Sequence, residues 1–307
     1  MKLGLRLPQR LGVDLQHDVV EAARTAEAAG YASLWTYERL LFPQTPAEQP
    51  NVPWPKHSRQ AADPLAVLTA AAVATEQVRL GIAVLVAALH TPVRLAKALA
   101  TIDQISGGRM IAGMGTGWST DEFQAAGAAG ADRGRFLDET LDVFDAVWGP
   151  DPVTFRSPRV VIDNASVLPK PASKIPVMLG GVSPMAVQRI VKRADGWLPF
   201  LSTPGSTGAA ELRASWDRIR HLASDYGRDA SRMEMVVVGN VTLTDRPAGL
   251  DRTPFVGTLD QIIDDVQTAA QAGADEVIID LNLQDWFTST RQMLETAVEI
   301  RERATAS

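Results

Sequence analysis

Residues 78–114, VRLGIAVLVAALHTPVRLAKALATIDQISGGRMIAGM, contain one complete strand–helix–strand unit. Its two ends, VRLGIAVL (78–85) and RMIAGM (109–114), are apolar runs of strand length, and the apolar residues between them recur at helical spacing. Both runs are almost continuously apolar, as expected of parallel strands that are covered on both faces. The same order of strand and helix recurs along the chain, so this stretch indicates the repeating unit of the fold.

Six further runs of this kind bring the number of expected strands to eight. Helix boundaries separate them: the helix over 15–29 stops at Gly30, and Thr258 with Gln261 and Ser119 with Glu122 have the spacing of capping boxes. Eight such units in 307 residues predict an α/β TIM barrel, a single domain over residues 1–307, with a doubly wound sheet as the structural alternative. The expected strands are 2–7, 33–37, 78–85, 109–114, 176–180, 195–200, 234–243 and 275–281.

Two proline-rich insertions, at about 42–63 and 149–175, interrupt this rhythm, and the second contains one strand-like run, RVVID (159–163). In a barrel the first insertion follows the second strand and therefore lies over the carboxyl-terminal mouth, where active sites are built. It carries Lys56 and His57, which we expect to close over a bound ligand. A plain surface excursion is the alternative.

The composition narrows the function to small-molecule chemistry. The chain has no cysteine, which excludes disulfides, thiolate nucleophiles and iron–sulfur ligation. Its formal net charge of −6, without a run of lysine or arginine, predicts no binding to nucleic acid or to an anionic membrane surface. No apolar run reaches the length of a membrane span and no signal-peptide core is present, so we expect a cytoplasmic protein.

Groups that carry chemistry by themselves are scarce. The four histidines, His17, His57, His90 and His221, have no metal-site spacing, and no nucleophile or Walker motif occurs. We therefore expect no metal site, and a bound cofactor that performs the difficult step.

Two glycine-rich strand ends are candidate binding sites. AGMGTGW (112–118) lacks the spacing of a dinucleotide fingerprint and leaves a strand end without side chains. In MLGGVSP (178–184), Gly180 and Gly181 end a strand, Ser183 has the character of an N-cap and Pro184 suits the first helical turn. Bare amides at a helix N-terminus form an anion site, and a simple tight turn is the alternative.

Three blocks together resemble the luciferase-like monooxygenase superfamily, in particular its branch that uses the deazaflavin coenzyme F420. The most specific part is LAKALATIDQISGGR within the first block. The resemblance implies a TIM-barrel oxidoreductase that binds a flavin-like ring at the carboxyl-terminal mouth, transfers a hydride to or from a small organic substrate and, like many relatives, forms a homodimer. The blocks are SLWTYERL (33–40), residues 78–123, and VMLGGVSPMAVQRIVKRADGWLP (177–199).

The same resemblance implies positions for the cofactor. A non-prolyl cis peptide, by position Ala83–Val84, backs the ring, and the end of the fourth strand lines the other side of the pocket. The cofactor phosphate lies at the double-glycine turn. The implied cofactor-binding residues are Ala83, Val84, Gly115, Thr116, Gly117, Leu179, Gly180, Gly181, Val182 and Ser183.

This chain departs from the pattern of its deazaflavin-dependent relatives at the position of the expected proton donor. Many deazaflavin-dependent relatives have an acidic residue followed by histidine after the second strand, whereas this chain has Glu38 followed by Arg39. Arginine stays charged and is a poor general acid, although it stabilises anions. We expect Glu38 and Arg39 to bind the cofactor edge or to polarise the substrate. Trp118, which stands where some relatives have glutamate, should wall the substrate side, and His57 should close over it.

Other functions stay open on the sequence alone. The same fold supports a monooxygenase that uses reduced FMN and molecular oxygen, and a non-catalytic flavin-binding barrel. A sugar-phosphate barrel enzyme would use the same double-glycine turn, but such an enzyme normally has a catalytic lysine or paired carboxylates at its strand ends. Asp280 alone is thin support for it.

Overall fold

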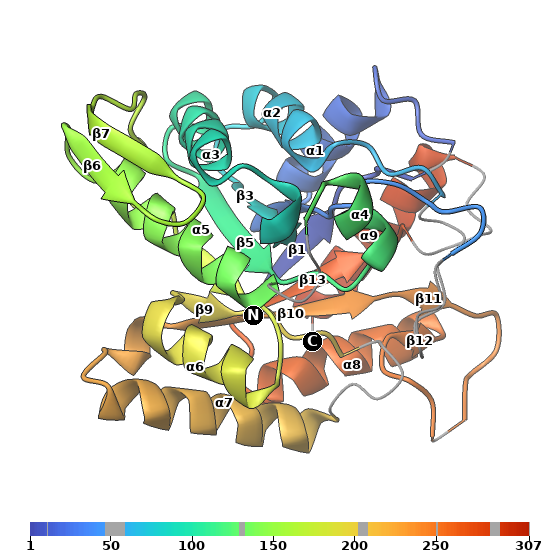
Figure 1. Ribbon diagram of the computed structural model, residues 1–307. Helices are drawn as coiled ribbons and strands as arrows, with labels where there is room; N and C mark the ends of the chain where they lie inside the picture. The colour runs from blue at the N-terminus through green and yellow to red at the C-terminus, as the bar shows by residue number, and fades with distance from the viewer. Residues whose placement is uncertain are drawn as a thin grey trace.

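The computed structural model describes residues 1–10, 12–46, 59–128, 133–201, 208–249, 251–282 and 289–306. Strands occupy the centre of the molecule, and most of the helices lie outside them (Figure 1). The strands of the central sheet are β1 (Lys2–Arg6), β2 (Ser33–Thr36), β3 (Arg79–Ile82), β4 (Leu85–Val86), β5 (Met110–Gly115), β8 (Val177–Leu179), β9 (Gly196–Trp197), β10 (Glu234–Asn240) and β13 (Glu276–Asp280).

The central sheet closes into a barrel. Within the described residues its order is β3-β2-β1-β13-β10-β9-β8-β5-β4, and β3 at the start of this order also pairs with β5, which closes the sheet. Every one of these pairings is parallel. The predicted TIM barrel is therefore confirmed, and the open doubly wound alternative is wrong. All eight expected strand runs contain a strand of this sheet.

Helices follow the strands and cover the barrel. Thr258 and Gln261 form the predicted capping box, and the first helix ends before Gly30, whose φ of 84° only glycine adopts readily. Among the described residues, no helix combines the length and the apolarity that a membrane crossing needs. The helices are α1 (Asp18–Ala28), α2 (Pro64–Ala74), α3 (Pro92–Ser106), α4 (Thr120–Ala125), α5 (Arg133–Trp148), α6 (Pro184–Arg193), α7 (Ala209–Asp225), α8 (Leu259–Gln271) and α9 (Thr290–Ala306).

The apolar core has two layers. The larger layer lies between strands and helices, and a smaller one fills the barrel interior. Trp35 occupies much of that interior, because a Cβ at Gly81 would lie 2.4 Å from its ring. The inner layer comprises Trp35, Ala83, Ile111, Met178, Leu198, Val236, Val238 and Ile278, with Val84 and Phe200 packed against it.

The insertion at 149–175 contains an antiparallel hairpin, β6 (Val153–Arg156) and β7 (Val161–Ala165), which projects beside α5 (Figure 1). Only the second of these two strands is predicted by the sequence pattern, because a four-residue strand such as β6 carries little periodicity. A second small pair, β11 (Thr242–Leu243) with β12 (Val256–Gly257), precedes α8. Most of the other insertion, residues 47–58, lies outside the described residues.

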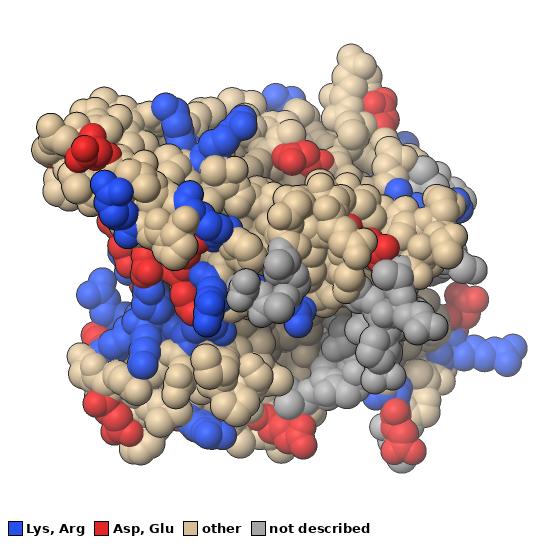
Figure 2. Space-filling model, viewed as in Figure 1, with Lys and Arg blue, Asp and Glu red and all other residues tan. Residues whose placement is uncertain are grey.

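Ion pairs tie α5 to α6. Arg189 forms a two-pronged contact with Asp138 at 2.7 and 3.0 Å, and Arg193 bonds Asp142 and Asp145 at 2.7 and 2.9 Å. Figure 2 shows basic and acidic side chains gathered side by side in this part of the surface. These contacts fix the orientation of α6, whose N-terminus follows the double-glycine turn.

Candidate active site at the carboxyl-terminal end of the barrel

The predicted site residues follow four different strands. Glu38 and Arg39 come after β2, Ala83 and Val84 after β3, the 115–118 segment ends β5, and the 180–183 segment follows β8. Because the strands are parallel, all four segments lie at the same carboxyl-terminal rim, where TIM-barrel active sites are found. The predicted cis peptide between Ala83 and Val84 is present. His57 and Lys56 lie outside the described residues.

Glu38 is held by two partners from the segment after β3. Its Oε2 accepts a hydrogen bond from the Val86 backbone N–H at 2.6 Å, and its Oε1 lies 2.6 Å from Nε2 of His90. The Glu38 side chain is 7% exposed and that of His90 21%. His90 therefore lies beside Glu38 at the candidate site, a position that no motif in the sequence predicted. The feature that could have indicated a site role for His90 is its position in the chain, directly after a strand end and the short 3-10 turn at Ala87–Leu89.

Arg39 lies between an aromatic ring and a buried carboxylate. Its guanidinium lies 4.6 Å from the centre of the Trp118 ring, and Nη1 bonds Oε2 of Glu122 at 3.3 Å. Burial lowers the pKa of Arg39, and Glu122 opposes that change. The structure thus brings Arg39 and Trp118 together as predicted, with the charge of Arg39 already balanced by a carboxylate.

Glu122 is a second residue whose partners differ from those that the sequence pattern predicts. Ser119 caps α4 by accepting from the Glu122 N–H at 3.1 Å, but Glu122 does not complete a capping box. Its side chain turns instead to Arg39 and to the Leu40 N–H, which it accepts at 2.7 Å. Burial raises the pKa of this carboxyl, and the Arg39 charge works against that rise. The expected reciprocal capping box is therefore wrong at this helix, because a partner distant in sequence competes for the carboxylate.

Arg6 and Asp280 form a buried ion pair at the same rim. The contact is 2.6 Å long, and the two side chains are 5% and 1% exposed. The other guanidinium nitrogen of Arg6 donates to the Ala83 carbonyl at 2.9 Å, so the pair fixes the cis peptide. Asp280 is thus committed to a structural ion pair, which removes the thin support for a sugar-phosphate barrel.

Tyr37 lies beside this pair, with Arg6 5.4 Å from the centre of its ring. Its hydroxyl is buried and has no hydrogen-bond partner among the described residues. Burial, with a further contribution from Asp280, raises the pKa of Tyr37 to about 12, so the hydroxyl stays protonated and able to donate. A buried donor without a partner is costly and points to a ligand that accepts from it.

The glycines at and after the end of β5 let the segment that follows β3 pack closely against this strand end. A Cβ on Gly115 would lie 2.7 Å from Val84, and one on Gly117 would lie 2.5 Å from Val86. Gly117 also has a φ of 68°, and its carbonyl accepts from Arg133 at 3.0 Å. Side chains at these two positions would collide with the segment that follows the cis peptide. Thr116, between them, is half-buried.

The double-glycine turn has the predicted helix start. Ser183 caps α6 by accepting from the Ala186 N–H at 3.2 Å, and Pro184 opens the helix. Gly181 has a φ of 104°, and its carbonyl accepts from the Trp197 indole at 3.0 Å. Val182 is 63% exposed at the tip of the turn, whereas Leu179 is buried in the outer core, so that only the backbone of Leu179 is available to a ligand.

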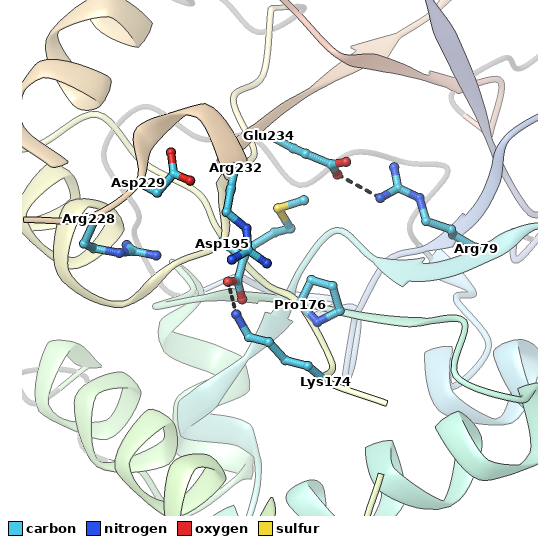
Figure 3. Close-up of a pocket in the computed structure, with 9 residues that line it drawn as sticks. Arg79, Lys174, Pro176, Asp195, Arg228, Asp229, Arg232 and Glu234 are labelled. Carbon is cyan, nitrogen blue, oxygen red and sulfur yellow. Dashed lines mark hydrogen bonds and ion pairs between the residues drawn. The ribbon is translucent and has the colours of Figure 1, made fainter. Parts of the chain in front are cut away.

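A charged cavity of about 500 Å³ lies at the opposite, amino-terminal end of the barrel (Figure 3). Arg79 binds Glu234 at 2.8 Å and Glu276 at 2.7 Å, while Lys174 contacts Asp195. These charges satisfy one another, and this end of a TIM barrel serves stability rather than catalysis. The cavity is therefore not the candidate site. The described residues contain no cluster of three potential metal ligands either.

Comparison with known proteins assigns the family. The family model described as luciferase-like monooxygenase matches residues 1–253. The chain belongs to the luciferase-like monooxygenase family. The resemblance inferred from the three sequence blocks is thereby confirmed.

The individual relatives share low sequence identity with this chain. An uncharacterised protein of Mycobacterium tuberculosis is 32% identical over 58% of this chain, and the matched region spans 65% of that protein's length. An F420-dependent glucose-6-phosphate dehydrogenase of Nakamurella multipartita is 26% identical over 79% of this chain and 68% of its own. A solved F420-dependent secondary alcohol dehydrogenase, in complex with an F420–acetone adduct, superposes with a TM-score of 0.76 over 99% of both chains at 17% identity, which shows a shared fold.

Proposed function

We propose that this chain is a coenzyme F420-dependent oxidoreductase that transfers a hydride between the deazaflavin ring and a small organic substrate. The observation that carries the proposal is the meeting of three features at one rim: the cis peptide Ala83–Val84, the bare strand end at Gly115 and Gly117, and the double-glycine turn before α6. The F420-dependent relatives support this cofactor.

The rim suits a flat, polar-edged ring. Val84 and Phe200 provide apolar surface against the inner core, and Gly115 lets the Val84 side chain lie against the end of β5. The protonated Tyr37 hydroxyl, without a partner among the described residues, would donate to an acceptor on the ring edge. These features fit an isoalloxazine-like ring, whose carbonyl oxygens and ring nitrogens are hydrogen-bond acceptors.

The double-glycine turn suits the cofactor phosphate. The first backbone N–H groups of a helix have no partner within the helix, and the helix dipole adds positive potential there. Ser183 accepts through its hydroxyl oxygen at this turn, which leaves the hydroxyl hydrogen to donate to an anion. A Cβ at Gly181 would lie 2.8 Å from Ala186, so the turn is closely fitted to its helix.

When bound, the deazaflavin supplies a carbon atom that accepts or releases a hydride. The chain's own residues orient the reactants and exclude water. In this proposal Trp118, with Arg39 against its ring, forms the wall of the substrate side. Glu38 is kept in one orientation by the Val86 N–H.

A monooxygenase that uses reduced FMN is the second candidate, because the family takes its name from that activity. The deciding experiment is a fluorescence titration of the purified protein with coenzyme F420 and, separately, with FMN, each oxidised and reduced. We expect F420 to bind at least about tenfold more tightly than FMN, a difference of about 1.4 kcal/mol. A preference for reduced FMN would instead indicate a monooxygenase that inserts oxygen. Binding of neither cofactor would contradict the proposed function and leave a barrel without flavin or deazaflavin chemistry.

A further inference from the structure

We propose that His90, oriented by Glu38, exchanges the proton that accompanies hydride transfer, and that the substrate is accordingly an alcohol, or a carbonyl compound in the reverse direction. The inference rests on the proposed function and adds an acid–base residue and a substrate class to it. Arg39, which stands where relatives have a histidine, then leaves the proton chemistry to a residue from the neighbouring strand end.

The contact between Glu38 and His90 has the geometry of an oriented imidazole. Nε2 of His90 lies 2.6 Å from Glu38 Oε1, while the other Glu38 oxygen is fixed by the Val86 N–H, also at 2.6 Å. A carboxylate at one ring nitrogen holds the proton on that nitrogen, which leaves the other nitrogen to take or give a proton. For His90 that atom is Nδ1, which has no hydrogen-bond partner among the described residues.

The burial of the pair suits this role. Glu38 is 7% exposed, so its carboxylate is shielded from water, whereas His90 is 21% exposed and remains accessible to a ligand. An imidazole is the side chain whose ordinary pKa is closest to neutrality, which is the condition for efficient proton exchange in both directions.

The other ionisable groups of this rim are less suited to exchange a proton. Arg39 is paired with Glu122, and Glu122 is occupied by Arg39 and the Leu40 N–H. Arg6 and Asp280 bind each other in the barrel wall. Tyr37 has a pKa of about 12, so it donates a hydrogen bond but does not release its proton near neutral pH.

The proposed step balances. In the direction of alcohol oxidation, the O–H bond of the substrate breaks and its proton passes to Nδ1 of His90. The C–H bond of the carbon that bears this oxygen also breaks. Its two electrons leave with the hydrogen as a hydride to the deazaflavin, and a C=O bond forms between the carbon and the oxygen. The substrate is oxidised by two electrons, the deazaflavin is reduced by two, and His90 later releases its proton to water.

The contrasting explanation is a purely structural clamp between the ends of β2 and β4. The variant His90→Gln distinguishes the two explanations, because the glutamine amide still donates a hydrogen bond to Glu38 but cannot exchange a proton. A clamp predicts that His90→Gln behaves as the unmodified protein and His90→Ala does not. A proton-exchanging role predicts that both variants are equally impaired, while the remote His221→Gln, a change of a 79% exposed side chain, has no effect.

The first experiment needs no substrate. Diethyl pyrocarbonate modifies accessible imidazoles, and mass spectrometry follows each histidine separately, with and without saturating oxidised F420. We expect the cofactor to slow the modification of His90 at least fivefold and to leave His17 and His221 unchanged, since their side chains are 67% and 79% exposed. Unchanged modification of His90 in protein shown by fluorescence to bind F420 overturns the inference and leaves the proposed function standing. Failure of the unmodified protein to bind F420 overturns both.

The second experiment follows the loss of visible absorbance of bound F420 in single turnovers with 2-propanol and with glucose 6-phosphate as alcohol probes. We expect His90→Gln and His90→Ala to slow the reaction at least about 100-fold with unchanged affinity for F420. A His90→Gln rate equal to that of the unmodified protein, or failure of the unmodified protein to oxidise either alcohol, overturns the inference while the cofactor titration still decides the proposed function.

Discussion

Single residues at the rim have separable roles, because some shape the backbone and others carry charge. Gly181 belongs to the first kind: its φ of 104° and its closeness to Ala186 leave no room for a side chain. Glu38, Arg39, Glu122 and His90 belong to the second, and each contacts another member of this group. Changes at the two kinds of residue should therefore separate cofactor affinity from stability and turnover.

Gly181→Val should weaken the binding of coenzyme F420 at least tenfold, which corresponds to about 1.4 kcal/mol, because the new side chain blocks the approach of the phosphate to the turn. Fluorescence titration measures the dissociation constant. Gly227→Val is the matched control, since Gly227 also has a positive φ, 76°, but no atom within 4 Å of its added Cβ. Equal affinities in folded Gly181→Val and unmodified protein would locate the phosphate elsewhere.

Glu122→Gln should lower the free energy of unfolding by about 3 kcal/mol, because it removes the buried carboxylate charge that pairs with the half-buried guanidinium of Arg39. Glu122 is 3% and Arg39 18% exposed at the side chain. Denaturant unfolding measures the loss. Glu295→Gln serves as the comparison, since its pair with Arg291 is 64% and 84% exposed and should contribute less than about 1 kcal/mol. Equal losses of unfolding free energy in Glu122→Gln and Glu295→Gln would contradict the burial of the pair between Glu122 and Arg39.

At the scale of elements, the segments after β2, β4 and β5 support one another. Glu38 joins β2 to β4, and Glu122 joins the segment after β2 to α4. Phe123 of α4 packs on Val86 and Ala88 in a separate apolar cluster. The rim is therefore one packed unit, and a residue such as His90 is positioned by several elements at once.

Glu27 provides a pH-dependent link between α1 and the start of β3. Burial raises its pKa, but the N–H groups of Gln77, Val78 and Glu76 outweigh this effect, so the net pKa is lowered below 4.5. A carboxyl with a lowered folded pKa stabilises the protein above its unfolded pKa, and this stabilisation is lost as the pH falls through the folded value.

Glu27→Gln should accordingly lower the unfolding free energy at pH 7 and reduce the loss of stability between pH 7 and pH 3. Urea unfolding at a series of pH values measures both. Glu302→Gln, a change on the exposed face of α9, is the control. An acid profile that keeps its full slope in Glu27→Gln would show that other carboxyls are responsible.

At the scale of the whole molecule, the two ends of the barrel have different tasks. The carboxyl-terminal rim carries the candidate site, and at the amino-terminal end Arg79 on β3 joins β10 and β13 through Glu234 and Glu276. Glu276 is fully buried and also accepts from the Trp35 indole at 3.0 Å. The homodimer and the cytoplasmic location stay predictions.

Arg79→Met should destabilise the barrel by about 3–5 kcal/mol, because Glu276 would keep a buried charge without its partner. The affinity for F420 in the folded variant should not change, since the site lies at the other end. Denaturant unfolding and fluorescence titration measure the two quantities. Lys174→Met, in a pair whose lysine is 78% exposed, should leave both unaltered. A large loss of affinity in Arg79→Met would mean that the ends are coupled.

Features that depend on neighbouring residues could be predicted from the amino-acid sequence. Apolar runs, capping residues and glycines are local, so the strands, the double-glycine turn and the barrel followed from them, and the family blocks located the cis peptide. Long-range partners were not determined in this way: Glu38 meets His90 across 52 positions, Arg39 meets Glu122 across 83, and Arg6 meets Asp280 across 274. Parallel strand pairing in the folded barrel brings these side chains to one rim, because it places residues that are distant in the chain at equivalent strand ends. The tertiary structure therefore decided which residues share the candidate site.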